Sequence, residues 1–109
     1  MDTDDLPAPI RAFIDATNAG DSDRFVAAFT DDAHLEDWGR HFHGHDGIAD
    51  WDRTDNIGVQ SHFDLVSCEP GPDPDTYEVV LRVTGNGFNG TGPFAVRLRD
   101  GLIADVRIS

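Results

Sequence analysis

Residues 94–108 read FAVRLRDGLIADVRI, and this stretch decides the fold. Apolar and polar residues alternate on both sides of Asp100-Gly101, a pair that strongly favours a two-residue hairpin turn. Because successive strand residues point to opposite faces, each arm has one apolar face. The apolar positions of the two arms are Phe94, Val96 and Leu98, then Leu102, Ala104, Val106 and Ile108. The stretch therefore predicts two antiparallel strands with one buried side.

The alternation continues toward the N-terminus of the chain. Residues 77–83 alternate strictly and residues 62–69 alternate loosely. Residues 71–75 predict an open turn, and Asn89-Gly90 is a second two-residue hairpin signal. Glycines at 85, 87, 90 and 92 lie between two strands with no helix behind them, so bulges and a hairpin explain them better than a phosphate-binding loop. The second half predicts a four-stranded antiparallel meander.

The first half is helical in its periodicity. Apolar residues at helical spacing predict a helix over residues 6–19, with Asp5 as N-cap and Gly20 at its end. Asp21 can cap a second helix, whose buried side is formed by Phe25, Val26 and Phe29 and which ends at Asp31-Asp32. A short strand begins at Ala33, and a third helix, capped by Asp46, runs to about Asn56. In the short strand, Asp37 shares a face with Ala33 and Leu35.

Helices followed by a one-sided sheet predict an α+β fold, a single domain spanning residues 1–109. The 21 acidic and 8 basic residues give a formal charge of −13, which disfavours nucleic acid and anionic membranes as partners. No apolar run is long enough to span a bilayer, and the acidic start of the chain does not resemble a secretory signal. We therefore expect a cytoplasmic protein. Its single cysteine, Cys68, is expected to be a packed strand residue.

Several short motifs together resemble a known superfamily. They are Asn18-Ala19-Gly20-Asp21, Phe29 to Ala33 followed by Glu36-Asp37, Phe42-His43-Gly44 before Ile48, and Asp100 to Ile103. Their order is similar to that of nuclear transport factor 2-like proteins, which include SnoaL-like cyclases and ketosteroid isomerases. The resemblance implies a cone, in which three helices and a curved, mostly antiparallel sheet enclose an apolar cavity.

Asp37 is the first candidate for catalysis. It falls on the position that carries the carboxylate base in ketosteroid isomerase-like relatives, and strand parity independently turns it inward. Desolvation in an apolar cavity makes a carboxylate a better proton acceptor. The alternative is a structural role, in which Asp37 caps the turn at Gly39 or pairs with Arg40.

The resemblance also places aromatic residues around the cavity. Phe13 and Phe94 stand where the isomerases hold an enolate with a tyrosine and a protonated aspartic acid, and neither can donate a hydrogen bond. Steroid isomerisation by that mechanism is therefore not expected. Two further tyrosine positions of the relatives correspond to Phe29 and Asp52, and Asp52 is either a second cavity carboxylate or an exposed helix residue.

The histidines of residues 41–45 form the other dense cluster of reactive side chains. His41 and His43 could share a metal ion if they lay on one strand face, but the segment reads as a polar loop. Phe42 matches a buried anchor of the relatives, which turns both histidines away from the cavity. We expect no metal ion and no cofactor. His41 or His62 is the more plausible proton partner for Asp37 at the cavity mouth.

The two tryptophans leave two interpretations open, because Trp38 and Trp51 can either fill the core or stack against a flat ligand. The leading hypothesis is a small-molecule enzyme that performs proton-transfer isomerisation, cyclisation or hydration on an apolar substrate. The alternative is a non-catalytic binding or dimerisation domain. A homodimer is expected through the outer sheet face, with Val80, Ala95, Arg97 and Ile103 pointing outward.

Overall fold

The computed structural model describes residues 5–109, which form three helices and one six-stranded sheet. The acidic segment 1–4, from which we argued against a secretory signal, lies outside the described residues. The helices are α1 (Ala8–Ala19), α2 (Ser22–Ala27) and α3 (Gly44–Asp55), and a 3-10 turn η2 (Ile57–Val59) follows α3. The strands are β1 (Phe29–Asp37), β2 (Arg40–His43), β3 (His62–Pro70), β4 (Thr76–Thr84), β5 (Gly90–Arg99) and β6 (Leu102–Ile108).

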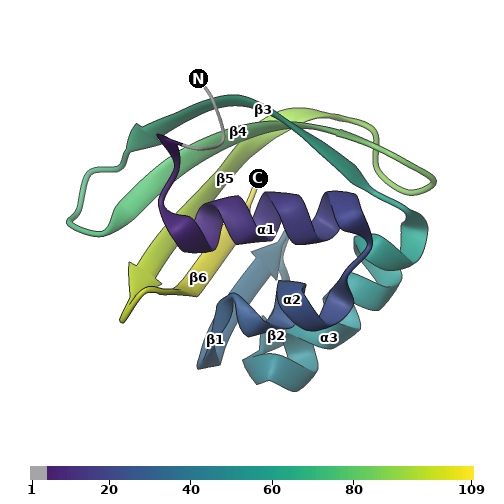
Figure 1. Cartoon of the computed structure of the whole chain (residues 1–109), viewed down its shortest axis with the longest axis horizontal. Helices are drawn as coiled ribbons and strands as arrows, with labels where there is room; N and C mark the ends of the chain where they lie inside the picture. The colour runs from purple at the N-terminus through teal and green to yellow at the C-terminus, as the bar shows by residue number, and fades with distance from the viewer. Residues whose placement is uncertain (1–4) are drawn as a thin grey trace.

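The sheet is mixed, with strand order β2-β1-β6-β5-β4-β3. Strands β3 to β6 form the predicted antiparallel meander, and β1 pairs with β6 in parallel. The sheet curves so strongly that β3 and β4 arch over α1, and the helices lie inside this curve (Figure 1). The predicted α+β architecture is confirmed. No helix among residues 5–109 is both long and apolar enough to cross a membrane.

Local sequence explains where the helices begin and end. Pro7 and Pro9 occupy the opening of α1, where the missing amide hydrogens have no helical partner to lose. Gly20 ends α1 in the left-handed conformation, at φ 69°. Asp21 then caps α2 by accepting a hydrogen bond from the backbone N–H of Arg24 at 3.1 Å.

The core is an aromatic cluster between α1 and the sheet. The ring of Phe13 lies within about 6 Å of four other phenylalanine rings, which come from α2, β1, β3 and β5. These four are Phe25, Phe29, Phe63 and Phe94. Edge-on and tilted rings of this kind stabilise a core beyond the area they bury. The cluster fixes α1 against the concave face of the sheet.

Two turns match their predictions and one does not. Asp100 and Gly101 have φ values of 55° and 78°, the positive pair required by a type I′ hairpin turn. Residues 71–75 form the predicted open turn. The prediction at Asn89-Gly90 was wrong, because the loop spans residues 85–89 and Gly90 already begins β5. Asn89 closes this loop by bonding the backbone N–H and C=O of Gly85.

Four further expectations were wrong. Phe29 begins β1 instead of continuing α2, and α3 begins at Gly44 instead of after Asp46. The segment around His41 is the strand β2, paired antiparallel with β1, and not a polar loop. Ile103 is fully buried, not outward, because a bulge between Arg97 and Leu98 shifts the register of β5 against β6.

Cys68 occupies a buried position in β3, as expected. Burial raises the pKa of its thiol, and the nearby charge of Glu69 acts in the same direction. The thiol is therefore kept in its less reactive, protonated form.

Candidate active site

A cavity of about 340 Å³ lies between the β1–β2 hairpin, the C-terminal end of α3 and the concave face of the meander. Its size falls in the range of pockets that hold small organic molecules. Most of its wall is apolar, and the side chains responsible are Trp51, Val59, Phe63, Val83, Phe94 and Ile108. A ligand in this cavity would bury mainly carbon surface.

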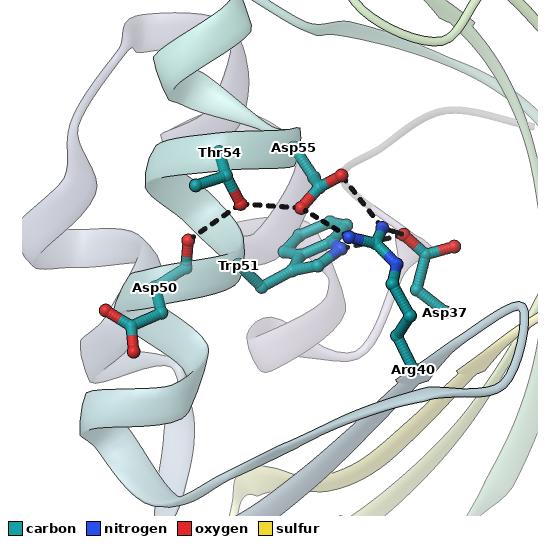
Figure 2. A network of polar contacts seen from close by, with 6 residues as sticks. All are labelled: Asp37, Arg40, Asp50, Trp51, Thr54 and Asp55. Carbon is teal, nitrogen blue, oxygen red and sulfur yellow. Dashed lines mark hydrogen bonds and ion pairs between the residues drawn. The ribbon is translucent and has the colours of Figure 1, made fainter.

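Asp37 brings a carboxylate to the wall of this cavity. It follows Ala33 and Leu35 on the inner face of β1, both of which are fully buried, and its own side chain is 15% exposed. Its Oδ2 accepts one hydrogen bond from Arg40 at 2.7 Å and another from the indole Nε1 of Trp51 at 3.0 Å (Figure 2). Among the described residues, Oδ1 has no such partner. One oxygen of the carboxylate is thus fixed by two hydrogen bonds, and the other makes none.

Arg40 joins two carboxylates of the cavity wall. It follows the tight turn after Asp37, and its guanidinium reaches Oδ1 of Asp55 on α3 at 2.8 Å (Figure 2). The hydrogen bond to Asp55 is the largest cause that raises the pKa of Arg40. Both charged partners are thereby fixed against each other, which ties the β1–β2 hairpin to α3.

Asp55 is also held by a hydrogen bond from Thr54 of the same helix. The Thr54 hydroxyl donates to Oδ2 of Asp55 at 2.6 Å and also lies 3.1 Å from the backbone carbonyl of Asp50. Burial alone would raise the pKa of Asp55, but the hydrogen bonds from Arg40 and Thr54 outweigh it and lower the pKa overall. Asp55 is therefore a charged partner of Arg40 and a poor proton donor.

Two exposed aromatic side chains stand at the edge of the cavity. Trp38 is 74% exposed and Phe88 is 60% exposed, yet both contribute to the cavity wall. Trp38 has φ 51°, a left-handed conformation that is unfavourable for a bulky residue and forms the β1–β2 turn together with Gly39. Trp38 thus presents an exposed ring from a strained turn at the edge of the cavity.

The structure brings together only some of the residues expected to form the site. Asp37, Trp38, Trp51 and Phe94 line the cavity. Phe13 and Phe29 lie instead in the aromatic core. Trp51 fills the core, since it is 3% exposed and stacks against Phe25, and it also forms part of the cavity wall.

Asp52 is neither a cavity carboxylate nor an exposed residue. It is 2% exposed and sits beneath the wall, where its Oδ2 accepts from the Ser22 hydroxyl at 2.7 Å and its Oδ1 accepts from Asn56 at 3.2 Å. Its partners place it in the contact between α2 and α3, and it does not line the cavity. It acts as a buried hydrogen-bond acceptor that joins the two helices.

Neither candidate histidine lines the cavity with Asp37. His41 stacks on His34 with ring centroids 5.1 Å apart, on the outer face of β1 and β2, and Nδ1 of His41 lies 2.9 Å from Nε2 of His34. The alternation of β2 causes this, because Phe42 packs toward the core and its neighbours must then face outward. His62 is exposed and contacts Asp64 at 3.3 Å.

Several lining residues were missed in the sequence. Arg40 was considered only as a structural partner of Asp37, whereas Asn56 and Ser61 follow α3 and carry no local signal of their own. Helical spacing from Trp51 to Asp55 could have placed Asp55 on the same side of α3. Among residues 5–109, no group of three metal-binding side chains is arranged to hold a metal ion.

A curved sheet that wraps around helices and leaves an apolar cavity is the cone of nuclear transport factor 2-like proteins. Residues 10–106 match the SnoaL-like domain, and the chain belongs to this family. A search of curated proteins returned no match.

Solved structures agree with this assignment. The chain is 25% identical to SMa1630 from Sinorhizobium meliloti, named a "putative polyketide cyclase", with all of both chains covered and a TM-score of 0.89. It is 21% identical to a Delta 5-3-ketosteroid isomerase from Mycobacterium sp., over 94% of this chain and 89% of that one, with a TM-score of 0.79. It is 17% identical to RV0760c from Mycobacterium tuberculosis, solved in complex with estradiol-17beta-hemisuccinate, over 93% and 89%, with a TM-score of 0.80.

Proposed function

We propose that this protein is a small-molecule enzyme that moves a proton within an apolar substrate, as an isomerase, cyclase or hydratase. The substrate lies in the cavity described above, and Asp37 is the general base. The proposal depends on one observation: Oδ2 of Asp37 is fixed by Arg40 and Trp51, while Oδ1 has no partner among the described residues. A carboxylate positioned in this way can accept a proton from a substrate carbon or from a water molecule.

The apolar wall supports the choice of substrate class. A largely hydrocarbon surface binds a molecule with little polar area, because polar groups would lose their hydration without a replacement partner. Structural neighbours named for a cyclase, an isomerase and a steroid complex are consistent with such a substrate.

The absence of hydrogen-bond donors at Phe13 and Phe94 limits the chemistry. Phe94 lines the cavity and Phe13 lies behind it, so neither supplies a proton to an enolate oxygen. Loss of one such donor slows an enzyme by about 100- to 1,000-fold. We therefore expect a reaction that needs little oxyanion stabilisation, such as addition of a hydroxyl group or water to an activated carbon.

The test uses a substrate that responds to any well-placed carboxylate base, 5-nitrobenzisoxazole. A base removes its single C–H proton of the five-membered ring, the electron pair forms a nitrile, and the N–O bond breaks to release a coloured phenolate. Wild-type protein should accelerate this reaction beyond acetate at equal concentration. Asp37→Asn should reduce the rate by about 100-fold or more, the typical contribution of a general base.

The matched control is Asp50→Asn, the same substitution on the exposed side of α3 and outside the cavity wall. It should leave the rate unchanged. If the wild-type protein binds 5-nitrobenzisoxazole but reacts with it no faster than acetate does, the alternative of a non-catalytic binding domain is favoured instead. The cation of Arg40 beside Asp37 is the observation that favours this alternative, because the carboxylate already has a partner within the protein.

A further inference from the structure

One buried polar atom in the cavity wall has no partner. Asn56 follows the last residue of α3, is fully buried and belongs to the cavity wall. Its side-chain oxygen, Oδ1, is the only buried side-chain nitrogen or oxygen within residues 5–109 that makes no hydrogen bond. A buried acceptor without a donor has lost its hydration with no replacement, and such atoms in native proteins need an explanation.

The orientation of the Asn56 amide follows from its neighbours. Its Nδ2 donates to Oγ1 of Thr17 at 3.0 Å and to Oδ1 of Asp52 at 3.2 Å. Thr17 uses its own hydrogen on the backbone carbonyl of Phe13 at 2.8 Å, and the carboxylate of Asp52 has no hydrogen to give. Both neighbours can therefore only accept from Asn56, so its nitrogen must face them and its oxygen must face away.

Thr17 and Asp52 lie behind the cavity wall, in the contact between α1, α2 and α3. The amide nitrogen is thus directed toward Thr17 and Asp52, and the oxygen points away from both of them. A chain of four hydrogen-bonded side chains holds this arrangement, from Thr17 through Asn56 and Asp52 to Ser22. The buried Asp52 therefore positions Asn56, a residue of the cavity wall.

Ser61 supplies a second polar group beside Asn56. It is buried, lines the cavity, and its backbone N–H donates to the backbone carbonyl of Asn56 at 3.0 Å. Its hydroxyl makes no hydrogen bond within the described part of the chain. Asn56 offers an acceptor and Ser61 offers a donor, which together match a hydroxyl group.

We propose that the cavity binds its ligand through a hydroxyl group, which donates to Oδ1 of Asn56 and accepts from the Ser61 hydroxyl. The ligand class is an apolar alcohol or phenol. A ketone in the same place would set its oxygen against that of Asn56 with no hydrogen between them. This inference rests on the proposed function, since it assumes that the cavity binds an apolar molecule.

The test compares three probes of nearly equal shape by isothermal calorimetry: 2-naphthol, 2-methylnaphthalene and 2-methoxynaphthalene. Only 2-naphthol has a hydrogen to donate. It should bind the wild-type protein about 10- to 100-fold more tightly than the other two, which corresponds to satisfying one buried acceptor. Equal affinities of the three probes would overturn the inference and leave the cavity's preference for apolar ligands standing. Binding of none would overturn the proposed function as well.

Variants identify the responsible residue. Asn56→Leu keeps the size of the side chain and should remove the preference for 2-naphthol, whereas the same substitution at Asn86, outside the cavity wall, should retain it. Ser61→Ala should reduce the preference. A preference that survives Asn56→Leu but is lost in Asp37→Asn would contradict the proposal, because the hydroxyl would then lie at the other end of the cavity.

A second measurement does not depend on the variants folding. In wild-type protein labelled with 13C-asparagine, the side-chain carbonyl resonance of Asn56 should shift when 2-naphthol is added and stay in place with 2-methylnaphthalene. An Asn56 resonance that responds equally to both probes would show that Oδ1 receives no hydrogen bond from the ligand.

Discussion

The indole nitrogen of Trp51 donates a hydrogen bond to Oδ2 of Asp37 across 3.0 Å. Trp51 is buried and stacks against Phe25 with ring centroids 6.0 Å apart, so the indole has one position. The carboxylate of Asp37 is therefore oriented by α3 as well as by its own strand. This contact determines which of its two oxygens is left for a substrate.

Asp37→Asn should lower the stability only slightly. The variant loses the ion pair between Asp37 and Arg40. Arg40 is half-exposed, so the loss should be at most about 1 kcal/mol, and asparagine keeps an oxygen for Trp51. Urea unfolding at neutral pH measures it. A loss above about 3 kcal/mol would assign Asp37 a mainly structural role.

Asp55→Asn should destabilise the protein in a pH-dependent way. The pKa of Asp55 is lower in the folded protein than its usual 3.8, so the folded state favours the charged form. That stabilisation is present above the unfolded pKa and disappears as the pH falls through the folded one. The difference in unfolding free energy between wild type and variant should be largest near neutrality and shrink below about pH 4. A difference that does not change with pH would show that the ion pair with Arg40 contributes nothing.

Trp38→Asn should stabilise the protein while weakening ligand binding. Asparagine adopts a positive φ more readily than tryptophan, and Asn-Gly is the preferred sequence for this kind of turn. We expect a gain of about 0.5–1 kcal/mol in unfolding free energy and weaker binding of 2-naphthol, because the exposed ring is lost. A variant with unchanged probe affinity would show that Trp38 does not contact the ligand.

The proposed homodimer can be tested on the outer face of the sheet. Ala95 is exposed there and lies opposite Glu78 on β4, so Ala95→Glu should place two like charges together and weaken association. Light scattering at micromolar concentration should give twice the monomer mass for wild type and a lower mass for the variant. Asn86→Glu, on the 85–89 loop, is the control with the same new side chain. A wild-type monomer at all salt concentrations would contradict the proposal.

Ile103, which the sequence placed on the outer face, is unsuitable for testing the homodimer. It is fully buried, and its backbone N–H donates to the carbonyl of Ala28 at 2.8 Å. Ile103→Glu would bury a charge without a partner and should cost more than about 4 kcal/mol, enough to unfold a small domain. Circular dichroism of the variant checks this, and a folded variant would show that the strand can shift its register.

The sequence predicted those features that depend on regular repetition. Period-two alternation places Asp37 inward because Ala33 and Leu35 fix the register of β1. A bulge breaks this rule at Ile103, and alternation alone gives no signal for a bulge. Asn56 and Ser61 could not be recognised, because their role arises from hydrogen bonds between segments that are far apart in the chain.

Several polar residues of the cavity wall lie together at the end of one helix. Thr54, Asp55 and Asn56 are consecutive, and Trp51 lies one turn before them, whereas the sheet supplies mainly hydrocarbon. Substitutions at Thr54 and Asn56 would change which molecules the cavity accepts without touching any strand pairing. Directed evolution toward a new substrate should therefore begin at these two positions, because Trp51, Asp52 and Asp55 also hold the elements of the fold together.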